Sequence, residues 1–243
     1  MLFDNCTSRV LQVMKRESHA LRKICFAMTL ACFFGRAAIS AERVTFRSGE
    51  DGYSGTSDAE IWALAPATIL NSNPQVTVDQ SNGGDESQVL MRFDGIIGKQ
   101  AGQIPPNARV VSARLEVGAF DQGDSVHLHR MLVPFGRAPT WNRLIDGVSA
   151  DDLEALRVTE TFTFGRISAS ASYVAFEVTD TVQAWVNGAK NHGWVFINTG
   201  GNGWDFYSSD FDKVTQRPRL IVEFETKDRK SKLVADKNKQ LAK

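Results

Sequence analysis

The sequence predicts an all-β protein, an antiparallel β-sandwich with one short embedded helix. Three observations lead to this prediction. Short segments alternate apolar and polar residues at period two, as strands with one buried face do. Stretches rich in Gly, Asn and Pro separate these segments and are typical of turns. Only one segment has a strong helical pattern, so few helices exist to connect parallel strands, and the strands are expected to pair antiparallel.

The predicted strands follow one another along most of the chain. Residues 88–94 are expected to direct Val89, Met91 and Phe93 inward. Residues 109–117 repeat the pattern with Val111, Ala113, Leu115 and Val117 inward and Ser112, Arg114 and Glu116 outward. Two later segments show the same alternation, carried by Phe162 and Phe164 and then by Leu220, Val222 and Phe224. The turn-forming stretches between strands are 49–55, 82–85, 102–107 and 198–203.

The helical pattern lies between two apolar strands, within residues 176–198. Val182, Trp185 and Val186 share one face at helical spacing, which predicts that Trp185 is a core residue. Asp180 is in the N-cap position with Gln183 three residues later, and Gly188 is in the C′ position. Trp194 alternates with Phe196 in the following strand and is also expected in the core. Residues 151–156 indicate a second, short helix.

The first 41 residues have the three parts of a secretory signal peptide. Basic residues, among them Arg22 and Lys23, precede an apolar run over 24–35 and a small-residue stretch that ends at Ala41. The apolar run is too short to span a bilayer core of about 30 Å. We therefore expect a secreted protein, extracellular or periplasmic, with no membrane span. All three cysteines lie in this leader, so the mature chain would have no disulfide and no cysteine nucleophile.

The remaining chain divides into an acidic body and a basic tail. Residues 42–226 contain 15 Lys and Arg against 24 Asp and Glu, a net charge of −9, and are expected to form a single β-sandwich domain. That charge makes nucleic acid a poor partner. Residues 227–243 contain 7 Lys and Arg against 2 Asp, a net charge of +5. They are predicted to be a disordered tail, with docking to an anionic polymer as the alternative.

Several short blocks occur in an order that carries a family resemblance. They are Gly52–Asp58, Val89–Asp94, Ile104–Leu115, His129–Met131, Thr140–Asn142, Phe176–Trp194 and Arg217–Val222. Together they resemble the DNRLRE-type domains, also classed as family-96 carbohydrate-binding modules. The resemblance implies a secreted jelly-roll-like sandwich, commonly appended to polysaccharide-active or phosphoester-cleaving enzymes. Some members bind acidic polysaccharides such as alginate, so the resemblance implies a polysaccharide ligand and a separate enzyme partner for this chain.

Sugar binding requires exposed aromatic rings that stack on the apolar face of a pyranose, with polar neighbours for the hydroxyl groups. The candidates are Trp62, Trp141, Trp204 and Tyr207, of which Trp204 lies in a glycine-rich polar loop. The alternative for Trp204 and Trp141 is a structural role within the fold. An anionic ligand would also need arginines, because guanidinium pairs with carboxylate in a bidentate fork. Arg143 lies next to the Trp141 segment and is predicted to contribute; Arg92, Arg114, Arg130 and Arg219 are the other candidates.

A structural calcium ion is the one cofactor that the sequence suggests. Asp51, Asp58, Asp79 and Asp85 lie in or beside glycine-rich turns, which can supply the carboxylate and carbonyl oxygens that calcium prefers. The alternative is that these aspartates only stabilise turns.

The chain contains none of the short motifs that mark common catalytic sites. Gly-x-Ser-x-Gly, His-Glu-x-x-His and phosphate-binding loops do not occur in the sequence. This absence indicates a protein without a common catalytic site, and the resemblance implies a secreted, non-catalytic carbohydrate-binding module for an acidic, alginate-like polysaccharide. The alternatives are a structural or adhesive surface protein and, less favoured, a small polysaccharide or phosphoester hydrolase or a lyase.

Overall fold

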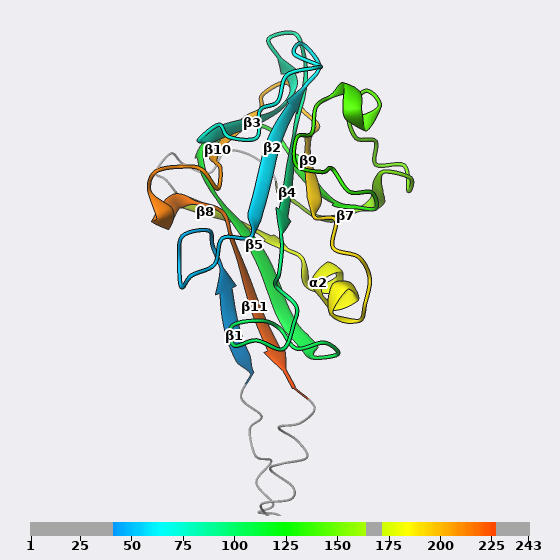
Figure 1. The fold of residues 1–243 in the computed structure, drawn as a ribbon. Coiled ribbons are helices and arrows are strands. Elements are labelled where there is room, and N and C mark those ends of the chain that lie inside the picture. The colour runs from blue at the N-terminus through cyan, green and yellow to red at the C-terminus, as the bar shows by residue number, and fades with distance from the viewer. Residues whose placement is uncertain (1–40, 164–171, 227–243) are drawn as a thin grey trace, which may run out of the picture. The chain divides into compact units, whose positions relative to one another are not determined.

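The computed structural model describes residues 41–163 and 172–226. Their elements follow one another from β1 to β11, with one α-helix, labelled α2 (Figure 1). The strands are β1 (Glu42–Phe46), β2 (Thr56–Trp62), β3 (Gln75–Asn82), β4 (Asp85–Phe93), β5 (Arg109–Asp121), β6 (Val126–Met131), β7 (Ala155–Thr163), β8 (Ser172–Glu177), β9 (Trp194–Asn198), β10 (Trp204–Tyr207) and β11 (Arg219–Glu225). The helix is α2 (Thr179–Val186), and two 3₁₀ turns occupy Asn142–Leu144 and Val214–Gln216.

The strands form two sheets that face each other. In sheet A, β1 pairs with β11 and β11 with β5, while β5 also pairs with β8 and β10. In sheet B, β2 pairs with β4, β4 with β9, β9 with β6 and β6 with β7. Strand β3 pairs with both β10 and β4 and so connects the sheets. All these pairs are antiparallel, and the predicted β-sandwich with one short embedded helix is confirmed.

The apolar side chains form two clusters, one on each face of sheet B. The inner core lies between the sheets and contains the predicted inward residues Val89, Met91 and Phe93. The outer cluster covers the opposite face of sheet B, where residues from the segment 132–154 pack on it. Its members are Ile61, Leu90, Met131, Phe135, Leu144, Val148, Ala155 and Val195. Strand β4 is therefore buried on both faces, which fixes its register against β2 and β9.

Helix α2 packs beside β5, and its C-terminus follows the sequence prediction (Figure 1). Gly188 has φ +106°, and the Gly188 and Ala189 amides donate to the Trp185 and Ala184 carbonyls. These are the bonds of a Schellman motif. The predicted N-cap is wrong by two residues, because Val178 is the N-cap and Asp180 lies in the first turn.

Gln183 does not serve in a capping box. Its side-chain oxygen accepts a hydrogen bond from the Val110 amide at 2.8 Å, and its nitrogen donates to the Ala108 carbonyl at 3.2 Å. The side chain thus satisfies backbone groups at the start of β5 and ties α2 to sheet A. Trp185 and Trp194 are core residues, as predicted, with exposures of 2% and 0%.

Two local predictions are wrong, and each has a physical cause. Ser112 pairs with Glu223 and Val110 with Phe224, so Val111 is the extra residue of a β-bulge. The bulge turns Val111 outward, to 39% exposure, and Val110 inward. Residues 151–154 form a turn instead of a helix. The Asp151 carboxylate accepts from the Leu153 amide at 2.9 Å, a local bond that competes with helix formation.

Several predictions concern residues outside the described ranges. They concern the predicted signal peptide, of which only Ala41 is described, the predicted basic tail of residues 227–243, and Phe164. Among residues 41–163 and 172–226, no helix is long and apolar enough to cross a membrane.

Candidate functional site

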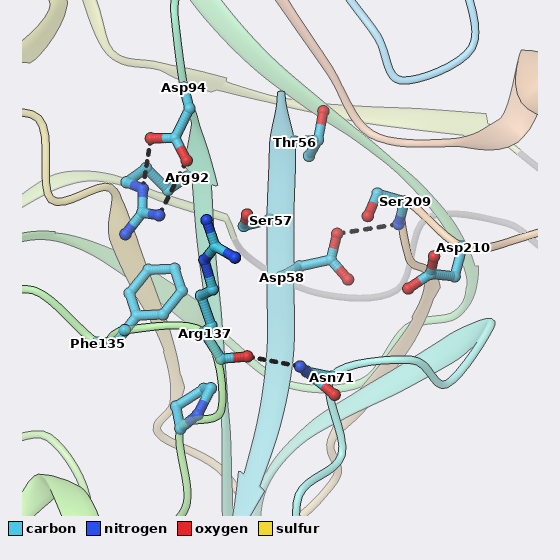
Figure 2. A pocket seen from close by; sticks show the side chains of 12 residues that line it. Thr56, Ser57, Asp58, Asn71, Arg92, Asp94, Phe135, Arg137, Ser209 and Asp210 are labelled. Atoms are coloured by element: carbon cyan, nitrogen blue, oxygen red, sulfur yellow. Dashed lines mark hydrogen bonds and ion pairs between the residues drawn. The ribbon is translucent and has the colours of Figure 1, made fainter. Parts of the chain in front are cut away.

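A cavity of about 450 Å³ opens at the edge of sheet B, beside strand β2. Its walls come from segments that are distant in the sequence: the start of β2, the end of β4, the loop before β3, the segment 135–139 and the turn after β10. The lining is mostly polar and consists of Thr56, Ser57, Asp58, Asn71, Arg92, Asp94, Phe135, Gly136, Arg137, Pro139, Ser209 and Asp210. Figure 2 shows Arg92, Phe135 and Arg137 on one side of β2, and Asp58, Ser209 and Asp210 on the other.

Arg92 is held rigidly in the wall. It lies near the end of β4, opposite Ser57 of β2. Its Nε and Nη2 atoms donate to the two carboxylate oxygens of Asp94 at 2.6 and 2.9 Å. The guanidinium carbon also lies 4.8 Å from the centre of the Phe135 ring, in a cation–π contact. Because Asp94 already occupies one edge of the guanidinium, Arg92 offers only part of its hydrogen-bonding capacity to a ligand.

Arg137 is the more available cation of the cavity. Its backbone carbonyl accepts a hydrogen bond from the Asn71 side chain at 2.6 Å, which attaches the 135–139 segment to the loop before β3. The Arg137 side chain is exposed, and its guanidinium forms no ion pair within the part of the chain that the structure describes. A fixed backbone and a free guanidinium together suit this residue to capture an anionic group.

Asp58 is the buried carboxylate of the opposite side. Asp58 is only 6% exposed, and one of its carboxylate oxygens accepts a hydrogen bond from the Ser209 amide at 2.9 Å (Figure 2). The pKa of Asp58 is raised to about 6, chiefly by burial, and the neighbouring Asp210 is a smaller cause in the same direction. Hydrogen bonds from Ser209 and the charge of Arg217 act in the opposite direction and do not cancel the effect of burial.

The two sides of the cavity have complementary chemistry. Guanidinium groups bind carboxylate or sulfate groups, and carboxylate, amide and hydroxyl side chains bind sugar hydroxyls. The ring of Phe135 belongs to the outer cluster and lies under Arg92, so it is not a free stacking surface. The cavity therefore has the chemistry to bind an anionic, hydroxyl-rich molecule. The arginines lie on one side and Asp58 on the other (Figure 2), so they would fix the orientation of such a molecule.

None of the five ligand-binding residues predicted from the sequence lines this cavity. The prediction for Trp204 is wrong, because its ring lies in the inner core with 1% exposure and its Nε1 donates to the Asp124 carbonyl at 2.6 Å. Trp62 is half-buried, and its Nε1 donates to the Asn82 carbonyl at 3.0 Å. Both indoles thus complete hydrogen bonds within the protein.

The other three predicted residues lie on the surface or near it. Trp141 is half-buried and packs against the outer cluster, with Gly147 against its ring. Tyr207 is half-buried and stacks on Phe211, with 3.9 Å between ring centres. Arg143 is exposed and donates to the Ala138 carbonyl at 2.6 Å. The structure does not gather these side chains into one platform around the cavity.

The four predicted calcium ligands do not converge. Asp58 lines the cavity, whereas Asp51 lies at a second cavity. Asp79, in β3, accepts from the Ser81 amide at 2.9 Å, and Asp85, at the start of β4, accepts from the Glu86 amide at 3.0 Å, so both make local hydrogen bonds. Among the residues described, no group of three or more His, Cys, Asp or Glu side chains could hold a metal ion.

The sequence indicated Arg92 as one of several candidate arginines and Asp58 as a calcium ligand, but Arg137, Asn71 and Asp210 were missed. A signal was present in each case. Arg137 lies in a loop that carries Gly and Pro, Asn71 lies in an Asn-Ser-Asn-Pro turn, and Asp210 follows two serines just after an apolar strand. Polar residues in turns are common, however, and only the fold brings these three turns to one edge.

Comparison with known proteins adds no assignment. No protein-family model matches the chain, and no curated protein is significantly similar to it in sequence.

Proposed function

We propose that this protein is an exported, non-catalytic binding module for an acidic, alginate-like polysaccharide, and that the polymer binds in the cavity beside β2. The observation that carries the proposal is the exposed guanidinium of Arg137, placed without an ion-pair partner among the described residues at the wall of a polar cavity of about 450 Å³. The resemblance to DNRLRE-type domains supports the same ligand class.

The acidic body, residues 42–226, carries a net charge of −9, which disfavours the approach of a polyanion. Long-range electrostatics opposes the encounter, so binding must come from short-range, charge-assisted hydrogen bonds. Arg137 supplies such bonds to a uronate carboxylate, and Arg92 adds donors from a fixed position. Asn71, Ser57 and Ser209 supply partners for the hydroxyl groups of the same sugar residue. Binding of this kind would be selective for geometry as well as for charge.

Affinity electrophoresis with polyuronate, a sulfated polysaccharide and a neutral glucan tests the proposal. A hydrogen bond to a charged group contributes about 1.5–3 kcal/mol, so Arg137→Ala should weaken polyuronate binding by about 10- to 100-fold. Arg157→Ala is the matched control, because Arg157 is also exposed and lies outside the cavity. Absence of retardation on every acidic polysaccharide, or equal losses in both variants, would contradict the proposal.

One observation favours a second function, hydrolysis of the polysaccharide. A carboxyl group with a pKa near 6, beside a second carboxylate, has the property required of a general acid, and Asp58 with Asp210 has this arrangement. Release of new reducing ends by the wild-type protein, abolished in Asp58→Asn, would establish this function. Under the binding proposal no ends are released, and Asp58→Asn still binds the polymer.

A further inference from the structure

A second cavity, of about 580 Å³, lies next to the first. It is formed by β1, the turn 51–53 and the segment that follows β4, and its lining includes Arg43, Phe46, Tyr53 and Gln103. No residue lines both cavities, but two pairs of lining residues are close in sequence: Asp94 lines the first cavity and Gly95 the second, while Thr56 lines the first and Tyr53 the second.

Hydrogen bonds connect the segments that line the two cavities. The Tyr53 hydroxyl donates to the Asp94 carbonyl at 3.0 Å, and the Asp94 amide donates to the Gly55 carbonyl at 2.7 Å. A Cβ atom at Gly55 would lie 2.4 Å from the Asp94 oxygen, so only glycine permits this close approach. These contacts hold residues 53–55, beside the second cavity, against Asp94, which lines the first.

Arg92 lies over the Phe135 ring in the first cavity, and the second cavity supplies another aromatic ring, that of Tyr53. Tyr53 is half-buried, and its ring packs edge-on against Phe46 with 5.3 Å between ring centres. Its position is fixed by this contact and by the bond to Asp94, as a stacking surface for a sugar ring requires. Arg43 lies at the same cavity with 56% of its side chain exposed, and its nearest carboxylate, Glu223, is 3.9 Å away.

We propose that the two cavities are adjacent subsites of one groove, and that a linear acidic polysaccharide bound at Arg137 continues across the Tyr53–Asp94 contact into the second cavity. There, one sugar ring stacks on Tyr53 and a carboxylate of the polymer pairs with Arg43. This inference rests on the proposed function, because it takes the same polymer as the ligand. Affinity then depends on oligomer length, since only a chain long enough to reach both cavities gains the second set of contacts.

Isothermal titration calorimetry with uronate oligomers of increasing length tests the inference. For the wild-type protein, affinity should rise at least about tenfold once an oligomer spans both cavities, which corresponds to one added charge-assisted contact. Arg43→Ala should remove this increment and leave the affinity for the shortest binding oligomer unchanged. Arg109→Ala is the matched control, because Arg109 is similarly exposed, pairs with Glu225 on the same strand as Glu223, and lines neither cavity.

The outcomes separate the two proposals. Short oligomers that bind in an Arg137-dependent way, without any gain for longer ones, would overturn the second subsite and leave the proposed function standing. An unchanged length dependence in Arg43→Ala would also overturn it. If no oligomer of any length binds, both proposals fail. Tyr53→Phe provides an independent measurement: it retains the ring and removes the bond to Asp94, so stacking and the length dependence should both persist.

Discussion

Replacement of Asp58 by Asn should stabilise the protein at neutral pH and leave its stability unchanged in acid. The pKa of Asp58 rises from 3.8 in an ordinary environment to about 6 in the folded protein, because burial disfavours the charged form. A group whose folded pKa is raised binds its proton more tightly in the folded state. Its contribution to stability is therefore greatest below about pH 4, falls as pH rises from about 4 to about 6, and is constant above that range.

The shift of about two pH units corresponds to about 3 kcal/mol at neutral pH, at about 1.4 kcal/mol per unit. The Asn side chain retains an oxygen that can accept from the Ser209 amide, so the variant avoids the cost of the buried charge without losing that bond. We expect Asp58→Asn to raise the free energy of unfolding by about 1–3 kcal/mol at about pH 7.5 and by nothing measurable at about pH 4.

Urea denaturation at both pH values measures this difference directly. Asp85→Asn is the matched control, since Asp85 is an exposed turn residue that accepts one local hydrogen bond. Its effect should stay within about 0.5 kcal/mol. A loss of stability in Asp58→Asn that is the same at both pH values would refute the reasoning. It would mean that the carboxylate is needed for its hydrogen bonds and that its charge carries no burial cost.

Two further predictions test packing around the site and the strand register. Gly147→Ala should cost about 2–3 kcal/mol in chemical denaturation, because Gly147 has φ +87° and the new Cβ would lie 2.7 Å from the Trp141 ring. Gly84→Ala, with φ +113° and no atom within 4 Å, should cost less; equal losses would exclude a role for the ring. Val110→Thr should lower stability by about 1–3 kcal/mol, whereas Val111→Thr should change it by less than about 0.5 kcal/mol. Thermal unfolding measures both changes. A larger loss in Val111→Thr than in Val110→Thr would mean that Val111 is not the extra residue of the bulge.

The elements that the sequence predicts well are those decided by neighbouring residues. The end of α2 depends on one glycine that can adopt positive φ, and the inward face of β4 depends on a simple alternation. The N-cap of α2 was misplaced because a tertiary contact intervenes. The Thr179 hydroxyl accepts a hydrogen bond from the Ala113 amide of β5 at 2.9 Å. This contact holds the first residue of the helix against β5.

Trp204 shows how a local context can mislead. Three glycines and several polar residues precede it, a composition typical of an exposed loop. The residues after it alternate, with Trp204 and Phe206 buried while Asp205 and Tyr207 are half-exposed. This four-residue strand pairs with β3, with Trp204 opposite Val78. Period-two alternation in residues 204–207 was the available signal, and it outweighs the composition of the preceding loop.

The composition of the cavity could not be read from the sequence, for a topological reason. Asp58 and Ser209 form a hydrogen bond across 151 positions, and Asn71 reaches the carbonyl of Arg137 across 66. No local pattern encodes such distances along the chain. The pairing of β2 with β4, and the crossing of β3 between the sheets, bring these turns to one edge.

The outer cluster supports the segment that carries Arg137, and this affects how the proposed ligand selectivity could be changed. Phe135 packs in the outer cluster and so attaches its segment to the outer face of sheet B. Arg137 is only two residues after this buried ring. A ligand that docks there meets a wall already ordered, and little conformational entropy is lost on contact. Exchange of exposed Arg137 would then change selectivity with little effect on the scaffold, whereas Gly136, with φ +69°, should be kept.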